Sequence, residues 1–143
     1  MKKIIGCLVA LAINVSIVSA ADLKDLEGEY KVVSFSVGGK KLDFVTKSWQ
    51  GVTIKGDMFT IKVDSGKNVI ERSSTIKLDA TKTPAQIDLA NTDGPDKGRS
   101  KPGIYSYENG KLTIVNSETG RPADIKGTGK SDEVLVLEKK KQK

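Results

Sequence analysis

The densest polar cluster of the chain is the run Asn91-Thr92-Asp93-Gly94-Pro95-Asp96-Lys97-Gly98. With Asp88, the carboxylates of Asp93 and Asp96 could supply the oxygen ligands that Ca²⁺ prefers. The spacing lacks the regular ligand positions and the closing glutamate of an EF-hand loop. Asp-Gly-Pro is also favourable turn chemistry, because glycine adopts positive φ and proline fixes the next φ. We therefore interpret the run as a structural loop and predict no metal site.

Enzymatic chemistry is restricted by what the composition lacks. The chain has no histidine and one cysteine, Cys7, so a Ser-His or Cys-His pair is impossible. A serine–lysine dyad stays open because both residue types are frequent, but no local signature marks one. The acidic residues are scattered among lysines, which favours solvated outer positions over a catalytic carboxylate pair. We predict a protein that is not an enzyme and uses no cofactor, with a hydrolase as a remaining alternative.

The first 21 residues have the three regions of a secretory signal. Met1-Lys2-Lys3 is basic, residues 4–13 are mostly apolar, and Val18-Ser19-Ala20-Ala21 offers small residues to a signal peptidase. The apolar run is too short for an ordinary membrane span. A lipid attachment at Cys7 is the alternative, but most of the apolar stretch follows that cysteine. We therefore predict cleavage near Ala20/Ala21, a periplasmic or secreted protein, and no stable membrane anchor.

Charge is unevenly distributed. The 143 residues include 24 basic and 18 acidic side chains, a net charge of +6. Removal of residues 1–21 leaves about 122 residues, enough for one core, with 22 basic and 18 acidic side chains. Four of those lysines lie in residues 139–143, and the body before them is neutral. We predict a solvated basic tail over 139–143, one domain over 22–138, and no nucleic-acid partner, because the body lacks a basic face with base-reading groups.

Apolar residues alternate with polar ones between short turns, which predicts antiparallel strands. In residues 30–37 the alternation slips phase at Val32-Val33, as it does at a β-bulge. Gly56-Asp57 and Asn109-Gly110 separate alternating segments and predict two hairpins. Residues 42–49 could form a brief helical turn with Leu42, Val45 and Trp49 on one face.

Further strands are expected over residues 69–78, around Ile87 and Leu89, and over 123–126. A polar loop is expected from Asn91 to Pro102. Residues 134–137 are continuously apolar, which predicts a closing strand covered on both sides. The total is about eight strands without a long helix. This pattern favours an all-β, up-and-down antiparallel barrel or a compact sandwich, and a barrel would leave no exposed sheet edge.

Several motifs resemble those of a known family. They are Leu26-Glu27-Gly28-Glu29-Tyr30-Lys31-Val32-Val33-Ser34, Gly39-Lys40-Lys41-Leu42, Lys77-Leu78-Asp79-Ala80-Thr81-Lys82, Pro84, Ile87-Asp88-Leu89, Thr92-Asp93-Gly94-Pro95-Asp96-Lys97-Gly98, Gly103-Ile104-Tyr105, Gly120-Arg121-Pro122 and Val134-Leu135-Val136-Leu137. The combined pattern, from about Leu26 to Lys139, resembles an uncharacterised exported domain family that is abundant in planctomycete proteins. That family is regarded as lipocalin-like and has no agreed biochemical activity. The resemblance therefore implies a small lipocalin-like β-barrel.

The resemblance also implies how the barrel closes. Gly28-Glu29-Tyr30 stands where lipocalins have Gly-x-Trp, whose tryptophan packs against an arginine near the end of the chain. Here Tyr30 replaces the tryptophan, and Arg121 is the nearest candidate for its partner. The family often has an aromatic residue shortly after Arg-Pro, where this chain has Ile125.

We predict an exported, monomeric, non-catalytic binding domain that holds a small apolar or amphipathic molecule inside the barrel. The residues predicted to line the pocket are Tyr30, Phe35, Trp49, Phe59, Ile76 and Tyr105, with Trp49 at the mouth. The alternative is an interaction module or inhibitor that contacts an envelope protein through a loop containing Asp93, Asp96 and Arg99. A dry, packed barrel interior would favour this alternative.

Overall fold

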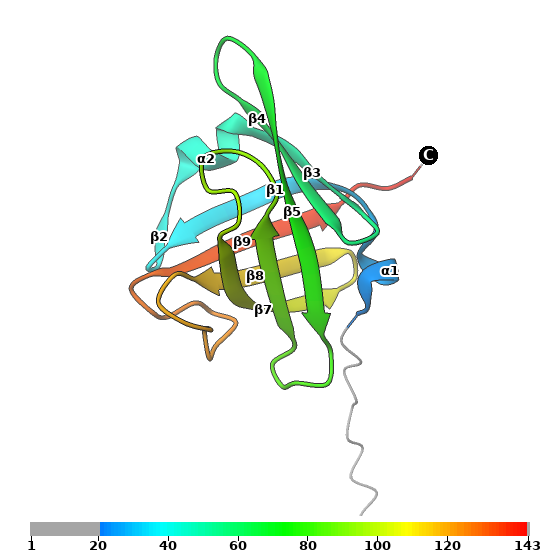
Figure 1. The fold of residues 1–143 in the computed structure, drawn as a ribbon, viewed down its shortest axis with the longest axis vertical. Coiled ribbons are helices and arrows are strands. Elements are labelled where there is room, and N and C mark those ends of the chain that lie inside the picture. Colours follow the sequence, from blue (N-terminus) through cyan, green and yellow to red (C-terminus); the bar gives the residue numbers. More distant parts are fainter. Residues whose placement is uncertain (1–20, 143) are drawn as a thin grey trace, which may run out of the picture.

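Antiparallel strands close into a barrel in the computed structural model, which describes residues 21–142 (Figure 1). The elements are α1 (Leu23–Leu26), β1 (Gly28–Val37), β2 (Lys40–Lys41), α2 (Asp43–Ser48), β3 (Trp49–Lys55), β4 (Met58–Asp64), β5 (Val69–Asp79), β6 (Gln86–Asn91), β7 (Ser100–Glu108), β8 (Lys111–Ser117) and β9 (Asp132–Lys139). From β3 to β9 each strand pairs with the next, and β1 pairs with both β3 and β9. Eight strands thus form the closed barrel, and β2 is a two-residue extension beside β1. The predicted all-β barrel is confirmed.

The first strand, β1, is bent and pairs with two other strands, β3 and β9. Its beginning pairs with β3, where Tyr30 lies opposite Val52, and almost its whole length pairs with β9. The register with β9 shifts between Val32 and Ser34, which confirms the bulge predicted from the phase slip. A bulge increases local bending and twist, so β1 diverges from β3. The short helix α2 follows β2 beside this divergence and buries Val45.

Both predicted two-residue hairpins are confirmed. Lys55 pairs with Met58 across Gly56-Asp57, and Glu108 pairs with Lys111 across Asn109-Gly110. Asn109 and Gly110 have φ values of 52° and 79°, the left-handed pair that a type I′ turn requires. The register that these turns set decides which side chains face inward.

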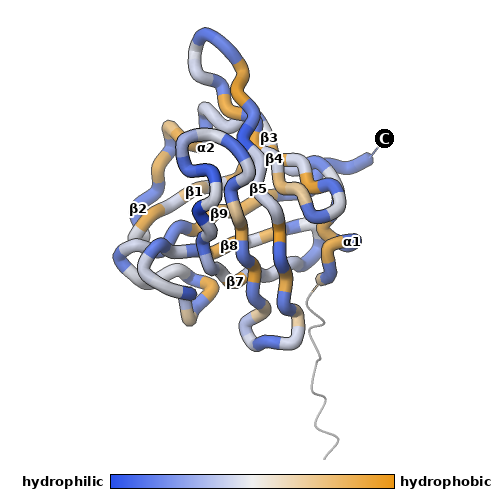
Figure 2. Tube along the Cα trace, in the orientation of Figure 1, coloured by the Kyte–Doolittle hydropathy of each residue, from blue (hydrophilic) through white to orange (hydrophobic). Residues whose placement is uncertain are grey.

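The core lies inside the barrel, where alternate residues of the strands meet. Figure 2 shows the alternation of apolar and polar segments along the strands. The buried apolar residues of this core are Ala21, Leu26, Tyr30, Val52, Ile54, Phe59, Ile76, Ala85, Ile87, Tyr105, Leu112, Ile114, Leu135 and Leu137. Burial of one such aliphatic side chain stabilises the fold by about 1.5–3 kcal/mol.

The long connection 118–131 covers part of the outer face of the barrel. Ile104, Val115 and Val134 are neighbours across β7, β8 and β9, and they point outward. Ile104 and Val115 are nevertheless 1% and 0% exposed, and a side chain on Gly127 of the connection would collide with Val134. The prediction of a strand covered on both sides is confirmed only in part, because Leu135 and Leu137 are buried while Val134 and Val136 are half-buried.

Three predicted boundaries were wrong. Residues 123–126 form no strand, because they belong to the connection that covers the outer face. The predicted loop from Asn91 to Pro102 is shorter, since β7 begins at Ser100 and pairs Pro102 with Asp88. Lys139 is the last residue of β9 rather than the first of a free tail. Among residues 21–142, no helix is long and apolar enough to cross a membrane.

Candidate functional site

One end of the barrel is closed by the chain segment that leads into it. Leu26 of α1 is fully buried, and its carbonyl accepts a hydrogen bond from the Tyr30 hydroxyl at 2.6 Å. The Tyr105 hydroxyl donates to the carbonyl of Ala21 at 2.5 Å. The Gly56 amide donates to the Glu27 carboxylate at 2.9 Å. Figure 1 shows α1 at the end of the barrel opposite α2, so α1 acts as a plug.

Lys139 completes this closed end, in the place predicted for Arg121. Its ammonium lies 5.7 Å from the ring centre of Tyr30 and 5.4 Å from that of Tyr107. It also donates to the carbonyl of Asp25 at 2.7 Å. The strand register explains why Lys139, and not Arg121, contacts Tyr30, since Lys139 is paired directly with Tyr30. Gly28, two residues before Tyr30, packs beside the aliphatic part of the same lysine.

Arg121 has a different task, so the prediction that it pairs with Tyr30 was wrong. It donates to the carbonyl of Gly103 at 2.7 Å and forms an ion pair with Asp88 at 2.8 Å. Asp88 and Gly103 lie on β6 and β7, so Arg121 fastens the 118–131 connection to the outer wall. Arg121 belongs to this connection, and its neighbour Pro122 is buried, so the position of Arg121 is set by the connection.

The two buried phenols of the closed end are held in their neutral form. Burial raises the pKa of Tyr30 well above its usual value, and the neighbouring Tyr107 adds to the effect. Burial also raises the pKa of Tyr105, with a further contribution from the carboxylates of Asp22, Asp25 and Asp79. Both hydroxyls donate to carbonyl oxygens, which is a structural role.

The opposite end of the barrel contains a cavity of about 420 Å³, here called the mouth cavity. Its lining residues are Phe35, Trp49, Ile61, Asn91, Asp96, Arg99, Ser100, Lys101, Asn116, Glu118, Glu133 and Leu135. Phe35 and Trp49 form an aromatic pair with ring centres 5.3 Å apart and planes tilted by 42°. Together with Ile61 and Leu135, this pair gives the cavity an apolar surface of the kind on which small molecules pack.

The polar wall of the mouth cavity is formed by β7, β8 and β9. Lys101 donates to both carboxylate oxygens of Glu133, at 2.9 and 3.0 Å. The Glu118 carboxylate lies 3.8 Å from the same ammonium. Asn116 is paired with Glu133 in the strand register and also lines the cavity. These side chains occupy inward positions that nearer the plugged end hold Tyr105, Ile114 and Leu137.

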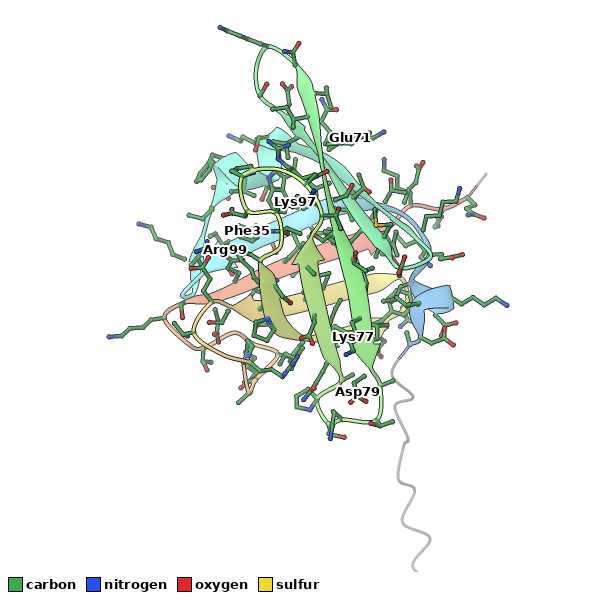
Figure 3. All side chains as sticks on the ribbon, viewed as in Figure 1. Phe35, Glu71, Lys77, Asp79, Lys97 and Arg99 are labelled. Carbon is green, nitrogen blue, oxygen red and sulfur yellow. The ribbon has the colours of Figure 1, made fainter. Side chains whose placement is uncertain are left out.

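The 92–99 loop forms the rim of the mouth cavity. Asp93 accepts the backbone N–H of Ser73 at 3.1 and 3.2 Å, which fixes the loop to β5. Asp96 and Arg99 form an exposed ion pair at 3.4 Å and both line the cavity. Figure 3 shows Phe35 and Arg99 at the end of the barrel that carries this loop. The predicted structural loop is therefore part of the cavity.

The carboxylates considered as calcium ligands have separate partners. Asp88 pairs with Arg121, Asp93 with the Ser73 amide and Asp96 with Arg99. Within residues 21–142 no group of three or more acidic, cysteine or histidine residues is arranged to hold a metal ion. In the same part of the chain, no serine hydroxyl is hydrogen-bonded to a lysine amine. Asp79 is bound by the Thr81 hydroxyl, which lowers the pKa of that carboxyl.

The six residues predicted to line a pocket are divided between the two ends. Phe35 and Trp49 line the mouth cavity. Tyr30, Phe59 and Ile76 are 0–3% exposed and belong to the packed core. Tyr105 is likewise in the core and borders a separate depression of about 670 Å³, formed with residues 80–85 and 123–125. The predictions from Cys7 and from residues 1–20 lie outside the described residues.

The polar wall was missed by the sequence analysis. The acidic residues were expected to be mostly solvated charges on the outer face, and no position inside the barrel was predicted for Lys101, Asn116 or Glu133. The signal was their spacing, since each lies two or four positions from an inward apolar residue on its strand. Counting from Tyr105, Ile114 and Leu135 in steps of two places them inside.

Fold and site together define a small antiparallel β-barrel with one end plugged and a mixed apolar and charged cavity at the other, an architecture compatible with a binding domain. No protein-family model and no curated protein matches this chain.

Proposed function

We propose that this protein is an exported, non-catalytic binding protein that holds a small amphipathic molecule in its mouth cavity. The observation that carries the proposal is the combination of the Phe35–Trp49 pair with the Lys101–Glu133 ion pair in one cavity of about 420 Å³. Such a cavity can bury a flat or aliphatic body and still meet a polar group. The resemblance of the chain to an exported lipocalin-like family leads to the same proposal.

Trp49 allows a direct test, because it is the single tryptophan of the chain and lines the cavity. The mature protein should be titrated with the neutral dye 1-N-phenylnaphthylamine at pH 7. We expect dye emission to rise and Trp49 emission to fall with the same dissociation constant, since both report one site. The proposal would be refuted if neither the dye nor a panel of neutral and charged amphiphiles changed the fluorescence emission.

Two phenylalanine variants localise the site. Phe35→Ala removes the partner of Trp49, and we expect the dye affinity to fall by about three- to tenfold, the usual value of an aromatic pair. Phe44→Ala is the matched control, because Phe44 is 68% exposed on α2 and does not line the cavity. Equal effects of the two variants would place dye binding elsewhere.

The alternative function, contact with an envelope protein through the 92–99 loop, predicts different results. Replacement of residues 93–99 by Gly and Ser would then abolish capture of the partner from a periplasmic extract. The same protein would bind no amphiphile. The binding proposal is preferred because Asp96 and Arg99 of this loop contribute to the cavity.

A further inference from the structure

The charges around the mouth cavity do not balance. Five charged side chains line it: Asp96, Arg99, Lys101, Glu118 and Glu133. Three are carboxylates and two are cations, so the lining has one surplus negative charge. Because this asymmetry lies beside an apolar surface, it bears on the chemistry of the ligand.

Existing contacts show which carboxylate is in surplus. Arg99 is paired with Asp96 at 3.4 Å, and both oxygens of Glu133 accept from Lys101 at 2.9 and 3.0 Å. Glu118 is left 3.8 Å from an ammonium that already binds Glu133, and this distance is too long for a hydrogen bond. Its side chain is 65% exposed, so it can turn toward a bound molecule at little cost.

The same contacts disfavour an anionic ligand. A carboxylate or phosphate would have to compete with Glu133 for Lys101, or with Asp96 for Arg99. It would also lie beside the Glu118 carboxylate, and two negative charges within one cavity repel each other. A cation meets the opposite situation, because Glu118 offers it a full charge and the amide of Asn116 lines the same wall.

On the basis of the proposed function, we propose that the ligand class is a cationic amphiphile, a molecule with an ammonium group and a short apolar body. The ammonium binds Glu118, and the apolar body packs on Phe35 and Trp49. Lys101 and Glu133 remain paired and keep the wall in place. This assignment goes beyond the cavity's general preference for amphipathic molecules, because it fixes the sign of the charge.

Three probes with one apolar body and different polar groups test the assignment. They are 2-(1-naphthyl)ethylamine, 2-(1-naphthyl)ethanol and 1-naphthylacetate, measured by isothermal titration calorimetry at pH 7 and low salt. We expect the amine to bind about two- to fivefold more tightly than the alcohol, as for one exposed charge contact. The acetate should bind more weakly than the alcohol.

Variants at Glu118 connect the preference to this residue. Glu118→Gln should lower the affinity for the amine about two- to fivefold, toward that of the alcohol, and leave the affinity for the alcohol unchanged. Glu118→Lys should reverse the order of amine and acetate. The matched control is Glu71→Gln, because Glu71 lies on β5, pairs with Lys62 across the outer face and does not line the cavity (Figure 3).

The outcomes separate the two proposals. Equal binding of amine and alcohol, or tightest binding of the acetate, overturns the cationic class and leaves a binding function standing. Failure of all three probes and of the neutral dye overturns both. An amine preference that Glu118→Gln and Glu71→Gln reduce equally also overturns the assignment, since it would come from the general field of the protein.

Discussion

Replacement of Lys139 by methionine should open the plugged end of the barrel. The methionine side chain keeps much of the aliphatic length that packs beside Gly28, but it has no charge and no donor. The variant therefore removes the cation from the faces of Tyr30 and Tyr107 and the hydrogen bond to the carbonyl of Asp25. It leaves the packing of the strand β9 in place.

The cost follows from these three contacts. Cation–π contacts within about 6 Å contribute about 0.5–1 kcal/mol each when partly exposed, and both distances fall within this limit. The hydrogen bond adds about 0.5–1 kcal/mol, the lower part of the range, because the Asp25 carbonyl is at the surface. We expect Lys139→Met to lower the free energy of unfolding by about 2 kcal/mol, or the melting temperature by about 6–10 °C.

Urea unfolding, followed by circular dichroism, measures this loss as a change in midpoint at constant slope. Lys139→Arg should retain most of the stability because it keeps the charge. Lys140→Met is the control, since the next lysine is exposed, and it should change stability by less than about 0.5 kcal/mol. A double-mutant cycle with Tyr107→Leu should give a coupling of about 0.5–1 kcal/mol. The proposed role of Lys139 in closing the barrel is refuted if Lys139→Met lowers the free energy of unfolding no more than Lys140→Met does. It is also refuted if the coupling between Lys139 and Tyr107 is zero.

Three other predictions concern the plug and the outer connection. Gly127→Ala should destabilise the protein by about 1–3 kcal/mol in the same urea assay, because its Cβ would collide with Val134 at a φ of 63°. Between neutral pH and about pH 10 the two buried phenols should leave stability unchanged. Above about pH 10 stability should fall, because the raised pKa values of Tyr30 and Tyr105 let the unfolded chain lose these protons first; Tyr105→Phe should make the fall, measured by thermal melts at several pH values, less steep. If the leader is removed, intact mass should place the new N-terminus at Ala21, because its buried carbonyl accepts from Tyr105 and a cut after it would remove that contact.

Local rules were sufficient to predict most of the barrel. The phase slip at Val32-Val33 has a local physical cause. Val32 and Phe35 lie three positions apart and can both face inward only if the strand takes up one extra residue in a bulge, and Val33 is accordingly exposed. The hairpin at Asn109-Gly110 is equally local, since it depends on two residues that tolerate positive φ. Both devices set register, and register alone brings Tyr30 beside Lys139.

The closure partner could not be predicted from motif order. Arg121 was chosen because lipocalins use an arginine near the end of the chain, and this choice ignored where the last strand would stop. The strand continues through Lys139, whose amide bonds the carbonyl of Gly110 at 2.7 Å. The 118–131 connection covers Val115 and Val134 on the outer face. Arg121 is part of this connection and therefore lies outside the barrel, away from Tyr30.

The contrast between the two ends of β7, β8 and β9 is the strongest argument that the mouth cavity has a function. Toward the plug, inward positions hold Tyr105, Ile114 and Leu137, all buried. Toward the mouth, the same faces hold Lys101 and Glu133, whose side chains remain 31% and 25% exposed. An ion pair in such a place loses hydration that its attraction barely repays, so apolar residues of similar size would stabilise the fold at least as well. Stability therefore does not account for the polar wall, whereas the proposed binding of an amphiphile with a charged group would account for it.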